Sequence, residues 1–494
     1  MGLITHSLPP YSGPYQVSTH DLELPLPSSS SSSFSPALLK STHQPALQLS
    51  TLLLTLFYPS SSSPSNRTNE RMPWVERPLT RTAQGYARFL GKSPLVVKGI
   101  VWLFGRGIRL PVEMDLPLVD EGEKGNDKRR VVVFSHGLSG NRTTYSQYCG
   151  ELASRGYIVA ALEHRDGSGP ITVVKLDDGT EKIVDYIKEN DIYYPNPDDS
   201  VPFLKFRASQ LLLRQAEISS LLSILSRINE GEGPSLELLN RRRNPSNSPF
   251  DFEGWKGRLN LDDTVMAGHS FGGATTIQVL RNNSSFTPSF KSGIALDPWA
   301  DPIPPASTSP TSSSSSTEIP SALNALPSDS SETLTTSSPS PVPPKSPSTS
   351  NTSSKESLEI DVPFLTINSE AFTLWKPHFY LIRQIVTRVE NHAKWFFTIL
   401  GSVHLSFSDL PLILPGYLSS KKQTTPPLTS HSLIVRTSLE FLDRKEGEVL
   451  GGQVRKGDEE YVNPDRGEEG KGPLRRDVEK GEGYERMHIK GNFD

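Results

Sequence analysis

The sequence predicts an α/β fold, in which helices cover both faces of a mostly parallel sheet. Short continuous apolar runs lie within residues 129–136, 157–163 and 264–267, and such runs are typical of strands buried on both faces. Turns and segments with helical spacing of apolar residues separate these runs. This repeated order of strand, turn and helix indicates parallel strands joined by crossover helices.

The remaining elements follow from the same patterns. Further strands are expected at residues 15–24, 52–58, 293–297 and 362–368. Helices are expected at residues 146–155, 207–225 and 379–400. Residues 231–250 are mostly polar and contain proline, so a loop is expected there.

Three parts of the chain have compositions that do not form a core. Ser, Pro and Thr dominate residues 302–358, polyserine begins the stretch at residues 28–45, and residues 446–494 are mostly charged or glycine. We therefore expect one catalytic domain over residues 1–445, with disordered insertions at those two places. Residues 446–494 are expected to be a disordered, charged tail.

Charge and cysteine content exclude several classes of function. The formal net charge of −4 gives no electrostatic case for nucleic-acid binding. Cys149 is the one cysteine, so neither an internal disulfide nor a cysteine-rich zinc site is possible. We expect no metal and no cofactor. Residues 1–27 lack the pattern of a secretory signal, and His6 stands where N-myristoylation requires Ser or Thr. A cytoplasmic protein is expected, with peripheral membrane contact as an option.

Residues 73–107 mix aromatic and aliphatic side chains with Arg and Lys, and two interpretations stay open. The segment could lie at a membrane surface, with apolar groups in the lipid and cations at the headgroups. It could instead form helices that pack on the domain and expose a basic face to water.

The strongest motif is Gly-His-Ser-Phe-Gly at residues 268–272. A buried strand precedes it and a segment of small residues suited to a helix follows it, which is the context of a nucleophile elbow. Glycine on both sides of Ser270 removes the Cβ atoms that would collide in so sharp a turn. The motif predicts that Ser270 is the nucleophile of an acyl-transfer reaction.

Two further residues complete a catalytic set. Asp297 ends the strand that follows the elbow helix, and His404 lies in a loop after the last strand and helix. The order Ser, Asp, His is that of an α/β-hydrolase. A serine hydroxyl is a weak nucleophile, so an imidazole must take its proton and a carboxylate must orient that imidazole.

Each assignment has alternatives. Asp301 could replace Asp297 as the acid, and His378 or His392 could replace His404 as the base, although their surroundings favour packed or surface histidines. His269 must point away from the nucleophile and is expected to support the turn. His136 and His164 end strands and are expected to support the catalytic residues or the fold, not to act in catalysis, and Cys149 is expected to be a buried apolar group.

The oxyanion hole requires two backbone N–H groups. The residue after the nucleophile, Phe271, supplies one donor in α/β-hydrolases. The second donor is expected from the turn at residues 136–138, where we assign it to Leu138.

Five short motifs occur in a fixed order along the chain: His-Gly-Leu at 136–138, Glu-His-Arg-Asp at 163–166, Gly-His-Ser-Phe-Gly-Gly at 268–273, Gly-Ile-Ala-Leu-Asp at 293–297 and Gly-Ser-Val-His at 401–404. With residues 9–15, they resemble the platelet-activating factor acetylhydrolases of the plasma and intracellular type II kind. The resemblance extends over nearly all of residues 9–443 outside the serine-rich insertions. An intracellular member is expected, although the chain fits neither the signal peptide of one kind nor the myristoylation pattern of the other.

The resemblance implies an α/β-hydrolase fold and a calcium-independent esterase. Such an enzyme removes short or oxidised acyl chains from the sn-2 position of glycerophospholipids at a lipid–water interface. The family's catalytic residues fall on Ser270, Asp297 and His404, and its oxyanion donors on Leu138 and Phe271. Two other functions stay open: a general carboxylesterase for small esters, and a non-catalytic interaction protein on a hydrolase scaffold.

Overall fold

The structure is a computed structural model of the whole chain. It describes residues 7–26, 34–61, 71–120, 128–243, 249–304, 359–389, 392–414, 423–445 and 450, together with the backbone of residues 485–489. Residues 28–33 of the first predicted insertion, residues 305–358 of the second and most of the predicted tail lie outside the described residues.

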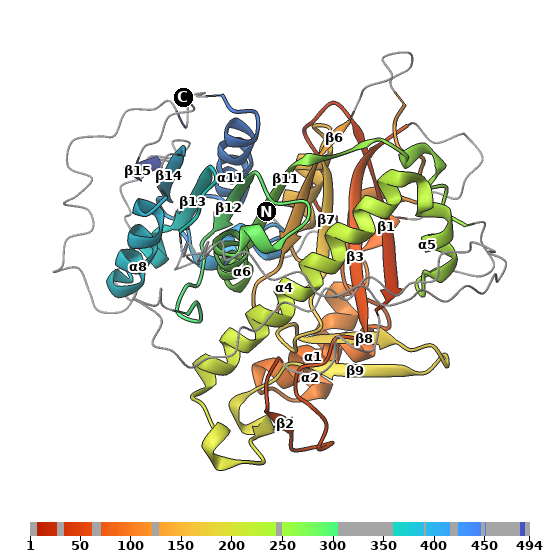
Figure 1. The fold of residues 1–494 in the computed structure, drawn as a ribbon, viewed down its shortest axis with the longest axis vertical. Helices are drawn as coiled ribbons and strands as arrows, with labels where there is room; N and C mark the ends of the chain where they lie inside the picture. The colour runs from red at the N-terminus through yellow and green to blue at the C-terminus, as the bar shows by residue number, and fades with distance from the viewer. Residues whose placement is uncertain are drawn as a thin grey trace, which may run out of the picture.

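A large mixed sheet forms the centre of the molecule (Figure 1). In spatial order its strands are β15 (Glu485–Ile489), β14 (Lys394–Ile399), β13 (Phe364–Ser369), β12 (Ser292–Leu296), β11 (Leu259–His269), β6 (Arg129–Ser135), β7 (Ile158–Glu163), β3 (Thr51–Ser60), β1 (Gln16–Pro25), β5 (Arg109–Met114) and β4 (Arg71–Pro73). The strands from β14 to β7 are all parallel, and β3 joins them in antiparallel orientation. This arrangement confirms the predicted α/β fold.

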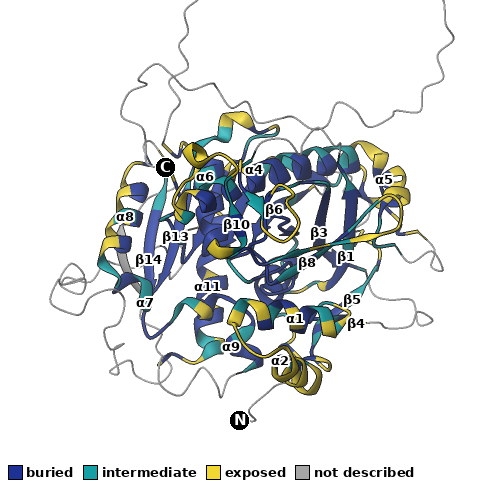
Figure 2. Cartoon of the chain, turned by 90° about the horizontal axis from the view of Figure 1, so that it is seen from below, coloured by how far each residue is buried: buried dark blue, intermediate teal, exposed yellow. Residues whose placement is uncertain are grey.

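Helices cover both faces of the sheet and form two separate cores. One core contains apolar residues of α4 (Phe203–Arg227), α6 (Phe271–Arg281) and α8 (Lys376–Thr387). The other contains residues of α3 (Ser146–Ala153) and α11 (Pro427–Leu442). Along β6, Val133 packs into the first core and Val132 into the second, as the alternation of side chains in a strand requires. Figure 2 shows the strands of the central sheet as mostly buried.

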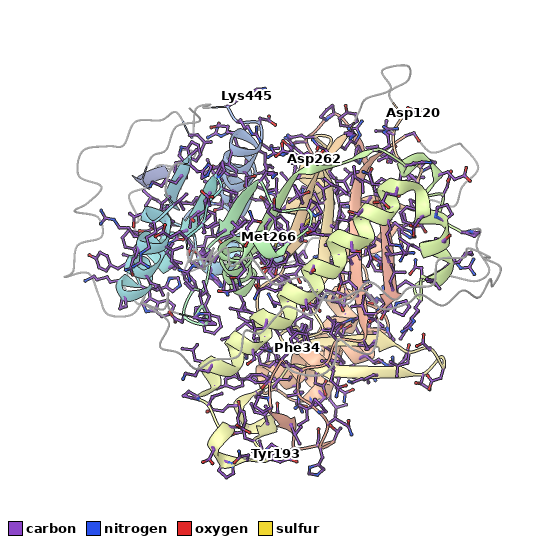
Figure 3. The ribbon with its side chains drawn as sticks, viewed as in Figure 1. Phe34, Asp120, Tyr193, Asp262, Met266 and Lys445 are labelled. Carbon is purple, nitrogen blue, oxygen red and sulfur yellow. The ribbon has the colours of Figure 1, made fainter. Side chains whose placement is uncertain are left out.

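A smaller group of elements, the lobe, lies beside the sheet (Figure 1). It consists of α1 (Leu79–Leu90), α2 (Pro94–Ile100), the π-helix η2 (Val101–Gly105), the hairpin of β8 (Ile171–Lys175) and β9 (Glu181–Asp185), and the antiparallel pair of β2 (Leu38–Leu39) and β10 (Ile192–Tyr193), which lie far apart in sequence. Figure 3 shows Tyr193 in this lobe and Met266 of β11 within the sheet. The short elements that remain are η3 (Glu189–Asp191), η4 (Pro197–Asp199), η5 (Ile228–Glu232), α5 (Gly233–Leu239), η6 (Glu253–Trp255), η7 (Asn283–Ser285), α7 (Glu370–Thr373), η8 (His404–Phe407) and α9 (Leu410–Ile413).

Two predictions about secondary structure were wrong. The helix expected to reach residue 400 ends at Thr387, and the aromatic run that follows forms β14. Trp395 and Phe397 of β14 face one core while Phe396 faces the other, so the run is buried on both faces. The loop expected at residues 231–250 contains α5, whose Leu236 packs into the first core.

Parts of the predicted disordered segments have defined structure. Within the first insertion, residues 34–45 are described and contain β2, and Ala37 is buried in the core. Within the expected tail, residues 485–489 form β15, which pairs antiparallel with β14. Among the described residues, no helix has both the length and the apolar character needed to cross a bilayer.

Candidate active site

Ser270 lies on a sharp turn between β11 and α6. Its backbone has φ 58° and ψ −118°, a conformation that non-glycine residues rarely adopt. The turn is closed so tightly that a Cβ on Gly268 would lie 2.3 Å from the carbonyl oxygen of Gly272, and a Cβ on Gly272 would lie 1.9 Å from that of Ser135. Glycine is therefore required at both positions, as in a nucleophile elbow.

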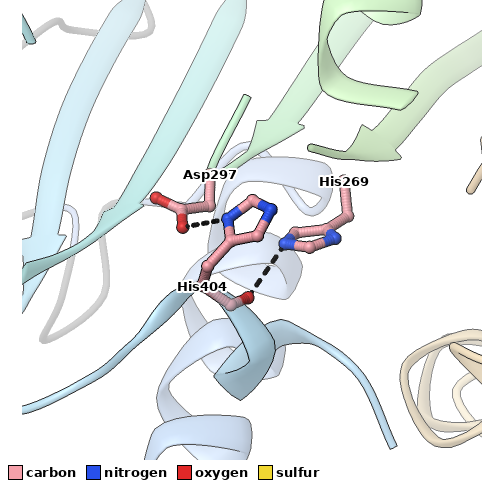
Figure 4. A group of neighbouring side chains, drawn as sticks. All are labelled: His269, Asp297 and His404. Carbon is pink, nitrogen blue, oxygen red and sulfur yellow. Dashed lines mark hydrogen bonds and ion pairs between the residues drawn. The ribbon is translucent and has the colours of Figure 1, made fainter. Parts of the chain in front are cut away.

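The three predicted catalytic side chains meet at the carboxyl ends of β11, β12 and β14. His404 Nε2 lies 2.8 Å from Ser270 Oγ. His404 Nδ1 lies 2.7 Å from Asp297 Oδ2, the contact drawn in Figure 4. Because a carboxylate can only accept, Nδ1 carries the proton and Nε2 is left to accept from the serine hydroxyl. Asp297 is fully buried, whereas the His404 side chain is 29% exposed. This geometry can transfer a proton from Ser270 to His404 as the serine attacks an ester.

The alternative acid, Asp301, and the alternative bases, His378 and His392, form hydrogen bonds with other partners. Asp301 accepts from the indole N–H of Trp299 at 3.1 Å, and no described contact joins it to His404. His378 accepts from the amide of Ala300 at 3.1 Å, and the exposed His392 bonds to Asp361 at 3.0 Å. The geometry therefore favours Asp297 and His404.

The turn after β6 carries one candidate oxyanion donor, the backbone N–H of Leu138. The N–H of Gly137 donates to the Tyr145 hydroxyl at 3.2 Å, and that of Ser139 donates to the carbonyl of Ser168 at 2.8 Å. Within the part of the chain that the structure describes, no hydrogen bond engages the N–H groups of Leu138 or Phe271. Phe271 begins α6, where the helix dipole and free N–H groups favour negative charge. Both amides are available to an oxyanion.

Buried groups beneath this turn hold it in place. His136 donates from Nδ1 to the carbonyl of Gly137 at 2.8 Å and accepts at Nε2 from the amide of His164 at 3.1 Å. Burial lowers the pKa of both imidazoles well below the ordinary value, so both rings are neutral. Arg214, fully buried, donates to the carbonyl of His136 at 2.9 Å and lies 4.3 Å from the centre of the Phe271 ring.

Comparison with known proteins places the chain in a family. The sequence profile of the family described as platelet-activating factor acetylhydrolase, isoform II, matches residues 4–313 and 351–461. The chain belongs to this family. A platelet-activating factor acetylhydrolase of Cavia porcellus is 35% identical over 250 residues, which are 51% of this chain and 50% of that protein. One from Bos taurus is 29% identical over 397 residues, 80% of this chain and 72% of the relative.

The matches differ in what they cover. The chain spans about half the length of the Cavia porcellus acetylhydrolase, as the alignment of 50% shows. Among solved structures, a ferulic acid esterase from Streptomyces cinnamoneus superposes with a TM-score of 0.50 at 18% identity, over 89% of this chain and 92% of that one. At this identity the likeness concerns the fold alone, and it agrees with an α/β-hydrolase fold for this member of the acetylhydrolase family.

Two residues that contact the candidate catalytic set of this acetylhydrolase-family chain were missed by sequence reasoning. Ser369, at the end of β13, donates to the Asp297 carboxylate from its amide at 2.6 Å and from its hydroxyl at 2.7 Å. The Phe372 ring stacks on His404, with centres 4.2 Å apart and planes 8° apart. The sequence offered one indication of this role for Ser369. The serine directly follows a predicted strand, and the carboxyl ends of parallel strands meet at one edge of the sheet, where Asp297 also lies.

One group of side chains could in principle bind a metal ion. Ligand atoms of His269, Asp297 and His404 lie within 4.8 Å of one another (Figure 4). Both nitrogens of His404 are engaged by Ser270 and Asp297, and His269 Nε2 bonds to the carbonyl of His404 at 3.1 Å. The short distances are thus those of a hydrogen-bonded set.

Proposed function

We propose that the chain is a calcium-independent serine esterase that hydrolyses short or oxidised acyl groups at the sn-2 position of glycerophospholipids. The observation that carries the proposal is the bonded set Ser270–His404–Asp297 on a nucleophile elbow. Membership of the acetylhydrolase family supports the phospholipid substrate.

The assigned residues supply every step of ester hydrolysis. His404 Nε2 takes the proton of Ser270 as Oγ attacks the ester carbonyl, and Asp297 stabilises the charged imidazole that results. The amides of Leu138 and Phe271 donate to the developing oxyanion. His404 then protonates the leaving alcohol, and a water activated by the same imidazole releases the acid and restores Ser270.

An exposed apolar surface supports action at a lipid interface. In α2 and η2, six large apolar side chains are more than a third exposed: Leu95, Val96, Ile100, Trp102, Leu103 and Phe104. Arg106 lies 4.3 Å from the centre of the Trp102 ring, so a cation flanks the apolar group, as at a membrane surface. Figure 2 shows α1, α2 and α9 along one side of the molecule. By contrast, α1 buries Ala83 and Ala87, so the two interpretations of residues 73–107 apply to different helices.

The test compares two phosphatidylcholines in the presence of a calcium chelator, one with an sn-2 acetyl group and one with a long sn-2 chain. We expect the acetyl substrate to be turned over with strong preference. Ser270→Ala should lower turnover by at least about 1,000-fold while leaving the thermal unfolding temperature unchanged, because alanine replaces only the hydroxyl.

Other outcomes would redirect the assignment. Turnover of soluble nitrophenyl esters but of neither phospholipid would indicate the general carboxylesterase. Full activity in folded Ser270→Ala would show that Ser270 is not the nucleophile. No labelling of Ser270 by a fluorophosphonate would favour the interaction protein.

A further inference from the structure

His269 and Tyr145 connect the turn that carries the candidate oxyanion donor Leu138 to the candidate base His404. His269 immediately precedes Ser270, and its side chain is buried, 2% exposed. Its ring packs against those of His404 and Phe407, with ring centres 4.5 Å and 5.5 Å away. The ring therefore lies beside the candidate base, as Figure 4 shows. Among the described residues, no hydrogen bond joins it to Ser270 Oγ.

A chain of three hydrogen bonds passes through this ring. The N–H of Gly137 lies 3.2 Å from the Tyr145 hydroxyl, that hydroxyl lies 2.8 Å from His269 Nδ1, and His269 Nε2 lies 3.1 Å from the carbonyl oxygen of His404. The chain starts at the amide next to Leu138 and ends on the backbone of the base itself.

The direction of every bond in this chain is determined. The carbonyl of His404 can only accept, so His269 Nε2 carries a proton. Burial, with the nearby His404, lowers the pKa of His269 well below the ordinary value, so the ring is neutral and Nδ1 accepts. Tyr145, whose pKa burial raises, then donates to Nδ1, and its oxygen accepts from Gly137. With a neutral ring, no other arrangement satisfies all three contacts.

Close packing restricts the residues that form these three hydrogen bonds. A Cβ on Gly137 would lie 2.9 Å from Ser270 Cβ and 3.0 Å from the Tyr145 hydroxyl, so the turn touches both the elbow and the tyrosine. The Tyr145 ring packs on that of Phe134, with centres 5.1 Å apart. A shift of either end of the chain would therefore move the other.

We propose that Tyr145 and His269 are positioning residues that fix the oxyanion turn and the base at one mutual distance. The proposal rests on the proposed function, because it assigns the two residues to the site of Ser270, His404 and Leu138. Occupation of the Gly137 amide by Tyr145 also assigns the oxyanion to the next amide, that of Leu138.

The test is Tyr145→Phe in the full chain, which removes one oxygen and keeps the ring. We expect kcat for p-nitrophenyl acetate to fall about 10- to 100-fold with little change in KM, because a small misplacement of reacting groups is costly. The rate of Ser270 labelling by a fluorophosphonate should fall in parallel. Tyr148→Phe is the matched control, since Tyr148 is also buried against Phe134, at 5.6 Å between ring centres, and should keep both rates within about twofold.

A second variant, His269→Phe, removes the two bonds of the ring but keeps its stacking. We expect the same loss of kcat, and no further loss in the double variant, because the bonded chain acts as a unit. Wild-type labelling rates in Tyr145→Phe, or additive losses in the double variant, would overturn the proposal. If the probe failed to label Ser270 in the wild type, the proposed function would fall and this inference with it.

Discussion

At the scale of single residues, the Asp297 carboxylate depends on Ser369 for two of its three bonds. The Ser369 hydroxyl also accepts from the amide of Phe372 at 3.2 Å and so caps α7. One side chain thus orients the acid and begins the helix that places Phe372 against His404.

Ser369→Ala tests this double role. We expect kcat to fall about 10-fold, since a hydrogen bond to a charged group is lost, and KM to change little. Stability should fall by about 1 kcal/mol through loss of the cap. Ester kinetics and urea unfolding measure the two effects. Ser220→Ala, which removes a buried serine hydroxyl from α4, is the control and should leave kcat unchanged. An unaltered kcat in Ser369→Ala would show that the backbone amide alone orients the acid.

At the scale of elements, a buried histidine joins β1 to α5. His20 bonds to Asp115 at 2.8 Å and to Glu237 at 3.0 Å. Burial alone would lower the pKa of His20, but the hydrogen bonds and charges of the two carboxylates outweigh it and raise the pKa to about 9. A raised pKa stabilises the fold most below pH 6.5, and this stabilisation is lost as the pH rises through 9.

We therefore expect the free energy of unfolding to fall by about 3 kcal/mol more in the wild type than in His20→Gln between pH 6.5 and pH 9. Urea unfolding at several pH values in this range measures the difference. Parallel curves for the two proteins would show that His20 does not carry the cation at this junction.

The apolar surface of α2 and η2 yields a second prediction at this scale. Leu95 and Leu103 are 81% and 56% exposed, so replacing both by Glu should leave the fold intact. We expect binding to phosphatidylcholine vesicles, measured by sedimentation, to weaken at least about 10-fold because the apolar contact is lost. Turnover of soluble esters should not change.

The control for this variant is the double replacement Leu238→Glu/Leu239→Glu on α5, where the side chains are 66% and 45% exposed. It adds the same charge outside the proposed surface and should leave vesicle binding unaltered. Equal binding by the Leu95→Glu/Leu103→Glu variant would exclude α2 and η2 as the membrane contact.

The elements of the site differ in how far the sequence reveals them. The strands that end at Asp297 and Ser270 could be predicted because each is an apolar run bounded by a turn signal. The strand β14 could not, since no glycine or proline separates it from α8 and its aromatic residues extend the apolar pattern of that helix. His404 was still placed correctly beyond the end of this run, because Gly401 ends the run whichever structure it adopts, but it begins the 3₁₀-helix η8 and does not lie in the predicted loop.

At the scale of the whole molecule, buried ion pairs join segments that are distant in sequence. Arg142, after the oxyanion turn, bonds to Asp21 at 2.7 Å and to Glu163 at 2.6 Å. Arg165, after β7, bonds to Glu23 of β1 at 2.7 Å. No local sequence pattern indicates which residues form such ion pairs. The sequence could therefore predict the strand ends but not the charged contacts that join them.

The direct pairing of β12 with β13 has a consequence for how the site is assembled. Gly293 pairs with Phe364 across the sheet, although residues 305–358 separate the two strands in sequence. Both cores contain residues from each side of that stretch. Covalent continuity is therefore not needed to bring His404 to Ser270 and Asp297.

A specific protease site inserted between residues 305 and 358 should thus yield a two-piece enzyme that keeps its turnover after complete cleavage. The first piece would carry the nucleophile and the acid, and the second the base. Denatured and separated, neither piece should hydrolyse an ester, and refolding them together should restore activity. Loss of turnover in proportion to cleavage, followed on a gel, would refute this. If the two pieces reassemble into an active enzyme, ester hydrolysis directly reports their association.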